Sequence, residues 1–334
     1  MRIAVTGSIA TDHLMTFPGC FTDHLVPGEL SNVSLSFLAD ALEVRRGGAA
    51  ANIAYGLGQL GLSPVLVGAV GPDFADYQVH LKEHGVDTDS VHVSHTAQTA
   101  RFVCTTDRAQ NQIATFYAGA MAEARTLSLA PVAERFGGLD LVLISPNDPE
   151  AMVRHTEESR RLGIPFAADP SQQLARLEPD AVRGLVDGAG RLFTNAYEAA
   201  LVRERTGWTS GQNLDRVGSW VTTLGADGVR IERAGEPAVT VPAAPVREIT
   251  DPTGVGDAFR AGFLAATARG LTRTASIRLG CSVAAEVIRT VGSQSYDAAA
   301  DRLLANLTAA YGTDAAEEIA PHLVAVTREG GDSS

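Results

Sequence analysis

The sequence predicts one doubly wound α/β domain with a mostly parallel sheet and a small inserted β-sheet lid. Short apolar stretches alternate with helical patterns along most of the chain, as in folds that cover a parallel sheet with helices. Two stretches without helical periodicity interrupt this alternation and supply the lid. We place the domain at residues 1–325 and expect the tail at 326–334 to be disordered.

The expected elements follow one another in strand–helix order. We expect strands at 3–6, 65–70, 141–145, 165–168, 192–194 and 220–224. We expect helices at 49–60, 74–84, 150–162, 197–206, 257–269 and 274–289. Four of these helices are followed directly by a glycine, at Gly61, Gly85, Gly163 and Gly270. A glycine there readily adopts the left-handed backbone that ends a helix, so these positions support the helical assignments.

The lid is expected at residues 13–45 and 92–118. Both stretches are richer in Thr, Val and Phe than the rest of the chain. The second contains the segment TARFVCTTDRAQNQIATFYAGA, which is typical of a hairpin with its turn near 107–111.

Composition excludes several classes of function. The 334 residues carry a net charge of −12, so a basic footprint for nucleic acid is absent. The longest apolar runs, such as 141–145, are far too short to span a membrane, and the N-terminus does not resemble a signal peptide. Three widely spaced cysteines are typical of free thiols in a reducing cytoplasm, where we place the protein.

The only lysine is Lys82, which lies in the segment HLKEHG at the end of a predicted helix. A P-loop needs a lysine after its glycines, and Schiff-base chemistry needs a reactive amine. Both reaction types are therefore disfavoured.

Polar residues and glycines follow several of the predicted strands. Asp12 comes after the first strand, Asn195 and Glu198 after the fifth, and the segment LGADG after the sixth. In an open parallel sheet, ligands bind beyond the carboxyl ends of the strands. A capping or turn role explains any one of these residues, but together they favour a site on one rim.

The segment 254–257 is the most specific of these signals. Glycines at the start of a helix let backbone amides approach a phosphate closely, and the helix dipole favours the anion. Asp257 would then face the nucleophile and accept its proton, while the amides hold the charge on the phosphoryl group. A role for Asp257 as a helix N-cap fits this stretch equally well.

The stretch DPTGVGDAFRAGFL (251–264) resembles the C-terminal signature of the ribokinase-like (pfkB) carbohydrate kinases. Further resemblances to that family are found in RGGAAANIA (46–54), TNAYE (194–198) and VTTLGADG (221–228). They occur in family order and extend from residue 3 to about residue 292. The resemblance implies a ribokinase-like fold, Asp257 as general base, and an anion hole of amides from Gly254, Val255 and Gly256. Val255 stands where a small residue is usual.

Within the family, segments 4–19, 99–107, 114–121 and 168–177 are similar to those of bacterial adenosine kinases. Gln173 occupies a position where sugar and sugar-phosphate kinases often carry arginine, which disfavours acidic sugars. The resemblance therefore implies ATP-dependent phosphorylation of the 5′-hydroxyl of adenosine to AMP. The alternatives are a kinase for another nucleoside or a free sugar such as ribose and, more distantly, a non-catalytic nucleoside-binding protein.

The resemblance also implies roles for individual residues. The ribose is expected at Ser8, Asp12, Ser36, Gly48 and Asn52. The purine is expected against Phe102 and Phe116, whose flat apolar rings suit a base, with Gln172 or Gln173 at its polar edge and Arg176 near phosphate. Packing within the lid is the alternative for both phenylalanines, and an exposed surface position is the alternative for Arg176.

The remaining implied roles concern ATP and its ions. The ATP site is expected at Asn195, Thr223, Gly225 and Gly228, with Glu198 holding Mg²⁺ through water. Asp251 and Thr253 match positions that bind a monovalent cation such as K⁺ in many family members. The family resemblance and the exposed edges of lid strands together predict a homodimer through the lid.

Two other sequence motifs do not lie in the structural context that their functions require. GLGQLG (56–61) ends a predicted helix instead of linking a strand to a helix, as dinucleotide binding would require. HLKEH (80–84) matches a zinc-peptidase pattern, but it precedes Gly85 directly, and a solvated helix face is the expected interpretation.

Overall fold

The structure is a computed structural model of the chain, and it describes residues 1–26, 28, 31 and 34–323. The predicted tail at 326–334 and a few residues of the first lid segment lie outside the described residues. Within the described part of the chain, no helix combines the length and apolarity that a membrane span requires.

A nine-stranded sheet forms the centre of the main body, in the order β13-β12-β11-β10-β9-β8-β1-β4-β5. Its strands are β1 (Ile3–Thr6), β4 (Val65–Val70), β5 (Val91–Val93), β8 (Leu141–Ile144), β9 (Phe166–Ala168), β10 (Arg191–Asn195), β11 (Trp220–Thr223), β12 (Val229–Arg233) and β13 (Glu236–Val241). From β5 to β11 all neighbouring strands are parallel, whereas β12 and β13 add an antiparallel edge. The predicted doubly wound, mostly parallel sheet is confirmed.

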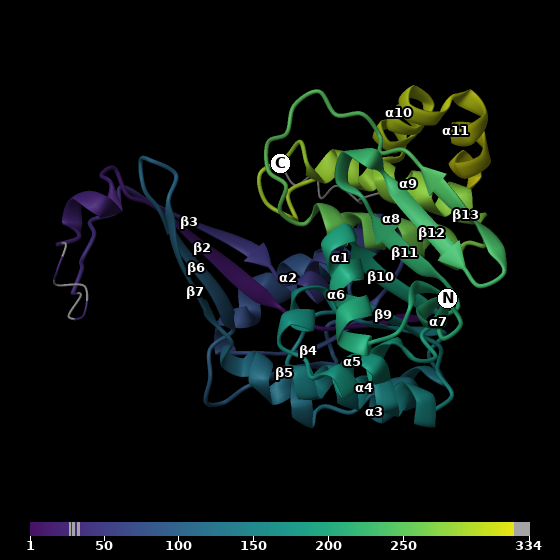
Figure 1. Cartoon of the computed structure of the whole chain (residues 1–334), viewed down its shortest axis with the longest axis horizontal. Coiled ribbons are helices and arrows are strands. Elements are labelled where there is room, and N and C mark those ends of the chain that lie inside the picture. Colours follow the sequence, from purple (N-terminus) through teal and green to yellow (C-terminus); the bar gives the residue numbers. More distant parts are fainter. Residues whose placement is uncertain (27, 29–30, 32–33, 324–334) are drawn as a thin grey trace, which may run out of the picture.

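Helices cover both faces of this sheet (Figure 1). The first face carries α1 (Ala49–Gln59), α2 (Ala75–Glu83), α8 (Val255–Ala268) and α9 (Arg273–Val287), with α10 (Ala300–Tyr311) and α11 (Thr313–Ile319) packed on α9. The second carries α3 (Ala130–Phe136), α4 (Pro149–Arg161), α5 (Pro179–Val186), α6 (Ala196–Thr206) and α7 (Ser210–Leu214). Side chains alternate between the two cores: Ile3 and Val5 of β1 pack on the first face, and Ala4 packs on the second.

A separate four-stranded sheet, in the order β3-β2-β6-β7, projects from the main body as the lid (Figure 1). Its strands are β2 (Ala10–Thr16), β3 (Ala41–Gly47), β6 (Ala100–Thr106) and β7 (Gln112–Tyr117). The hairpin turn predicted near 107–111 is confirmed, because the Asp107 carboxylate accepts backbone N–H groups from Ala109 and Asn111 at 2.9 and 2.8 Å.

The lid strands differ from the approximate lid segments of the prediction at two points. The first lid segment extends from Ala10 to Gly47, beyond the predicted 13–45. The second begins too early in the prediction, because Val91–Val93 pairs with β4 at the edge of the main sheet. A three-residue strand has no periodicity that would distinguish an edge of one sheet from the start of another.

One row of side chains crosses the lid on a single face. In the strand register Asp12 lies opposite Arg45 of β3 and Phe102 of β6, and Phe102 lies opposite Phe116 of β7. Side chains at paired positions point to the same face of a sheet. Asp12 and the aromatic pair Phe102 and Phe116, all predicted from the sequence to bind substrate, therefore share one surface with Arg45.

Candidate active site

The carboxyl ends of the parallel strands meet at one edge of the main sheet, and the lid is attached there. Strand β1 ends at Thr6, and β2 of the lid begins only a few residues later, at Ala10. Asp169 directly follows β9, and Asn195 is the last residue of β10. This edge is where an open α/β sheet binds ligands.

Helix α8 begins at the glycine segment predicted to bind a phosphoryl group. Gly254 is its N-cap, with a left-handed φ of 77°. A Cβ atom added to Gly254 would lie 2.4 Å from Cβ of Ser293, so glycine is required by both backbone conformation and space. The first N–H groups of a helix have no partner inside the helix and are available to an anion.

Asp257 lies in the first turn of α8, where its side chain faces inward. The N-cap alternative for Asp257 is excluded, because the cap is Gly254 and no side chain caps this helix. Instead, Asn52 Nδ2 of α1 donates a hydrogen bond to Asp257 Oδ2 at 2.8 Å. Burial raises the pKa of Asp257, while Arg260 and the Asn52 hydrogen bond oppose that rise. A carboxylate whose pKa is raised is a stronger proton acceptor.

The amide of Asn52 is held in a single orientation. Its Oδ1 accepts hydrogen bonds from Ser293 Oγ at 2.9 Å and from Gln294 Nε2 at 2.8 Å. Gln294 Nε2 also donates to Tyr77 Oη, and Tyr77 Oη donates to the carbonyl of Gly47 at the base of the lid. Because both donors lie on one side of the amide, the NH₂ group must face Asp257.

Arg260 lies one helical turn after Asp257 and is 7% exposed. Its Nη2 forms an ion pair of 2.6 Å with Oδ1 of Asp169, the residue after β9. A Cβ atom added to Gly256 would lie 2.8 Å from Arg260 Nη1, so the guanidinium packs directly behind the glycine segment. Burial raises the pKa of Asp169 to about 7, although Arg260 opposes the rise.

Asn195 and Glu198 form a reciprocal cap at the start of α6. Asn195 Oδ1 accepts the N–H of Glu198 at 2.8 Å, and Glu198 Oε2 accepts the N–H of Asn195 at 2.7 Å. The charge of Glu198 also raises the pKa values of Asp169 and Asp257. Asp169, Asp257 and Glu198 thus all act electrostatically on the single guanidinium of Arg260, and negative charge is in excess at this edge of the sheet.

Similar known proteins identify the family of this chain. Residues 8–299 match the pfkB family of carbohydrate kinases. This chain belongs to the pfkB family of carbohydrate kinases. A nucleoside kinase of Methanothermobacter thermautotrophicus is 32% identical over 254 residues, covering 75% of this chain and 80% of that protein. A nucleoside kinase of Methanocaldococcus jannaschii is 27% identical over 251 residues, covering 75% of this chain and 81% of that protein.

A solved structure is also similar to this pfkB-family kinase. The nucleoside kinase of Burkholderia thailandensis in complex with inosine superimposes with a TM-score of 0.80 at 32% identity, covering 93% of this chain and 98% of that one. A second structure of that protein, in complex with ADP-inosine, has a TM-score of 0.79, covering 93% of this chain and 96% of that one. The ribokinase-like fold expected from the sequence is therefore confirmed.

Two predicted ribose contacts of this pfkB-family kinase also hold the start of α1. Ser8 Oγ accepts the N–H of Ala49 at 3.0 Å. Gly48 has a φ of 94°, and a Cβ atom there would lie 2.6 Å from the carbonyl oxygen of Ser8. These contacts fix the first turn of α1, one turn before Asn52. Asp12 lies on the lid, where burial raises its pKa and Arg45 lowers it.

Ser36 is placed elsewhere. It is exposed and precedes Phe37, whose ring packs on Phe17 and Phe21 beyond the far end of β2. The structure does not bring Ser36 to Asp12.

The predicted purine contacts divide into buried and exposed residues. Phe116 is 48% exposed, so its ring is an open aromatic surface on the lid face that also carries Asp12. Gln173 is buried and its Nε2 donates to the carbonyl of Asn147 at 2.6 Å. Gln172 and Arg176 are exposed, as the surface alternative for Arg176 predicts.

Three buried polar atoms near Gln173 have no partner among the described residues. They are Gln173 Oε1, Asn147 Nδ2 and Ser145 Oγ. Ser145 and Asn147 follow β8, and sequence reasoning missed both. Buried polar groups are normally paired, so these unpaired atoms are a reason to expect a further partner, such as ordered water or a ligand, at this edge.

The predicted nucleotide-binding segment lies after β11. Thr223 ends that strand, and Gly225 has a left-handed φ of 61°. A Cβ atom on Gly228 would lie 2.1 Å from the carbonyl oxygen of Val241, so this glycine lets β12 start close to β13. The role of these residues in binding ATP stays a prediction.

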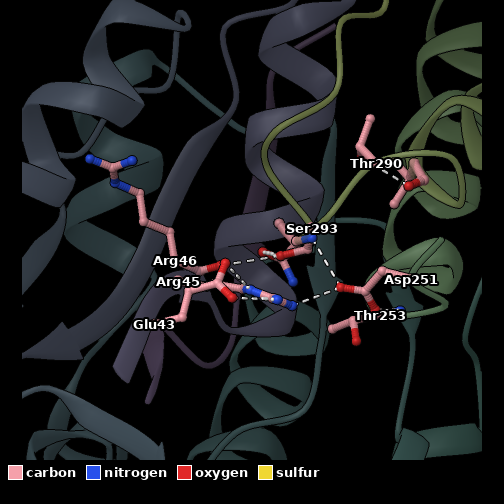
Figure 2. A network of polar contacts seen from close by, with 10 residues as sticks. Glu43, Arg45, Arg46, Asp251, Thr253, Thr290 and Ser293 are labelled. Atoms are coloured by element: carbon pink, nitrogen blue, oxygen red, sulfur yellow. Dashed lines mark hydrogen bonds and ion pairs between the residues drawn. The ribbon is translucent and has the colours of Figure 1, made fainter. Parts of the chain in front are cut away.

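The residues predicted for a monovalent cation lie beside the lid. Asp251 forms an ion pair with Arg45, and the exposed Thr253 donates its N–H to Asp251 Oδ1 at 2.9 Å (Figure 2). Sequence reasoning missed this ion pair because the two residues are far apart in the chain.

The HLKEH segment forms the solvated helix face that we expected only in part, because Lys82 and Glu83 are exposed whereas the two histidines pack on Tyr55. His80 stacks on Tyr55 with ring centroids 5.3 Å apart, and His84 packs on the same ring at 4.8 Å. Across the described residues, no group of three or more His, Cys, Asp or Glu side chains is arranged to hold a metal ion.

Replacing Arg260 with Met should destabilise the fold by about 3 kcal/mol, because breaking a buried ion pair leaves a charge uncompensated. Urea unfolding of the wild type and the variant measures this cost. The double variant Arg260→Met/Asp169→Asn removes both charges and should recover most of the loss. A single variant as stable as the wild type would contradict the assigned ion pair.

Proposed function

We propose that this kinase phosphorylates the 5′-hydroxyl of adenosine, using MgATP as phosphoryl donor and giving AMP and ADP. The observation that carries the proposal is the position of Asp257. It is a half-buried carboxylate, oriented by Asn52, in the same helical turn as the amides of the glycine segment. A base placed directly beside an anion-binding helix start is the arrangement that phosphoryl transfer to a hydroxyl requires.

In the proposed reaction, Asp257 accepts the proton of the 5′-hydroxyl as that oxygen bonds to the γ-phosphorus. The bond between the γ-phosphorus and the oxygen that bridges it to the β-phosphate breaks, and that oxygen leaves on ADP. Amides of Gly254, Val255 and Gly256 hold the charge on the transferring group. Arg260 packs behind Gly256 and adds positive charge at the start of the helix.

Mg²⁺ bound with the ATP would neutralise phosphate charge, and Glu198 is the residue proposed to hold it through water. Asn195, Thr223, Gly225 and Gly228 are proposed to line the ATP site. Closure of the lid would exclude water from the reacting groups and limit hydrolysis of ATP. The three cysteines are free thiols, which supports a cytoplasmic location for the enzyme.

Two features support a nucleoside substrate. One is the lid face that carries Asp12, Phe102 and Phe116, and the other is the set of unpaired atoms near Gln173. Asp12 and Asn52 are proposed to bind the ribose hydroxyls, and Phe102 and Phe116 to contact the base. Gln173 Oε1 and Asn147 Nδ2 offer one acceptor and one donor to its polar edge. Free ribose would leave the aromatic pair and this acceptor–donor pair unused.

Inosine is the second candidate substrate. The similar B. thailandensis nucleoside kinase has been solved in complex with inosine. Adenine presents an amino donor beside a ring acceptor, whereas hypoxanthine presents a ring N–H donor beside a carbonyl acceptor. An acceptor and a donor on adjacent chain segments complement either base. A non-catalytic binding protein would need neither Asp257 nor the amide cradle.

A coupled ADP-release assay across adenosine, inosine, guanosine, cytidine, ribose and fructose tests this proposal. Adenosine should have the highest kcat/KM. Gln173→Leu should lower kcat/KM for adenosine by about ten- to hundredfold, because a polar contact to the base is lost. Any residual ribose turnover should be unchanged in that variant and serves as its internal control. Ribose turnover equal to adenosine turnover, or no ADP release with any acceptor, would rule out the proposal.

We further propose that the enzyme forms a homodimer through the lid. Leu42, Val44, Ile113 and Tyr117 are exposed and point to the face opposite Asp12. They lie on β3 and β7, the two edge strands of the lid sheet. Exposed apolar side chains on strand edges favour pairing with another chain.

Sedimentation velocity should therefore show a dimer for the wild type and a monomer for Leu42→Glu, because the charge would be buried in the interface. Val79→Glu is the matched control, since Val79 is also exposed but lies on α2, outside the lid. It should remain dimeric. A monomeric wild type, or a Leu42→Glu variant that stays dimeric, would refute the lid interface.

A further inference from the structure

We infer that Arg45 of the lid is the resident cation of the phosphoryl-binding loop and replaces the monovalent cation expected beside Asp251. In this role Arg45 is a positioning residue that joins the substrate-binding face of the lid to the loop before α8. The inference rests on the proposed kinase function, and it names a charge that the chain itself supplies to that site.

The Asp251 carboxylate accepts hydrogen bonds from three segments of the chain. Oδ2 accepts Arg45 Nη1 at 2.9 Å and the N–H of Gly292 at 3.0 Å. Oδ1 accepts the N–H of Thr253 at 2.9 Å. Figure 2 shows Arg45 reaching from β3 to Asp251, below the loop that carries Ser293. The side chains of Asp251 and Arg45 are 12% and 22% exposed, so this ion pair is partly shielded from water.

These contacts do not fit a K⁺ ion coordinated by Asp251. A K⁺ ion bound to Oδ2 would stand beside the guanidinium, and the two positive charges would repel each other at that distance. Oδ1 is engaged by the backbone of its own loop. The charge that a bound cation would bring to this carboxylate is already present on Arg45.

Asp251 is coupled to the anion-binding amides through its two loops. It lies three residues before Gly254 and holds the N–H of Gly292. The next residue, Ser293, packs against Gly254 and donates to Asn52 Oδ1 at 2.9 Å. A displaced Asp251 carboxylate would therefore disturb both the amide cradle and the amide that orients Asp257. Misplacement of such groups by about 1 Å is enough to slow catalysis strongly.

On the lid side, Arg45 is held by Glu43. Arg45 Nε and Nη2 each donate to a Glu43 carboxylate oxygen at 2.7 Å. Glu43 and Arg45 are two residues apart on β3, so both lie on the lid face that carries Asp12. The guanidinium therefore spans from the face proposed to bind ribose to the loop proposed to bind phosphate. Binding of substrate against this face would act on the loop through Arg45.

The test compares wild type, Arg45→Met and Arg45→Lys, with Arg46→Met as matched control. Arg46 is the neighbouring arginine on the same strand, and its side chain points away from Asp251 (Figure 2). The kcat and KM for the best nucleoside are measured in choline, sodium and potassium chloride, and again with added guanidinium. Melting temperatures in potassium and choline chloride, without substrate, give a readout that does not depend on activity.

For wild type, Arg45→Lys and Arg46→Met, kcat should not depend on which of the three salts is present. Arg45→Met should lose about ten- to hundredfold in kcat in choline, and potassium or guanidinium should restore part of it. Potassium should raise the melting temperature of Arg45→Met above its value in choline, and it should not do so for the wild type.

Three results would overturn the inference. They are activation of the wild type by potassium over choline, unchanged kcat in Arg45→Met, or a loss in that variant that neither cation restores. If no nucleoside is turned over at all, the proposed function fails, but the melting experiment still decides this inference. An equal potassium shift in wild type and Arg45→Met would contradict it, and a shift confined to Arg45→Met would support it.

Discussion

The hydrogen bond from Asn52 to Asp257 is the interaction on which the rest of the site depends. A carboxylate that is partly shielded from water is costly unless it is paired. Asn52 on α1 and Arg260 on α8 share that task, and each is held by partners of its own. Helices α1 and α8, the loop at 291–295 and strand β9 are therefore fixed relative to one another around the Asp257 carboxylate.

The lid is connected to this centre by two routes. Tyr77 donates to the carbonyl of Gly47 at the base of β3 and accepts from Gln294, which orients Asn52. Two residues earlier on β3, Arg45 contacts Asp251 at the loop that leads into α8. Both routes join the surface proposed to bind the nucleoside to the groups proposed to transfer phosphate, so substrate binding and catalytic alignment are linked physically.

Sequence reasoning found the structural elements that local sequence patterns determine. All six predicted strands are present, and the glycines around Gly254 marked a helix start with unusual backbone. It did not find Arg260, Gln294 or Asn147, because burial and long-range partners give them their roles. An arginine inside the apolar pattern of the predicted helix 257–269 was the available signal for Arg260. The short helices α3, α5 and α7 and the antiparallel β12–β13 edge also escaped prediction, since short segments are set by tertiary packing.

The assignment of Asp257 as general base is tested most directly by a single-turnover measurement of phosphoryl transfer in Asp257→Asn. The substitution keeps the shape of the side chain and an oxygen that can accept from Asn52, but it removes the basic carboxylate. The rate of the chemical step should fall by about 10²–10⁴, while the dissociation constant for adenosine, measured by calorimetry, stays within a few-fold. A chemical step that remains close to the wild-type rate would contradict the role of Asp257 as the base.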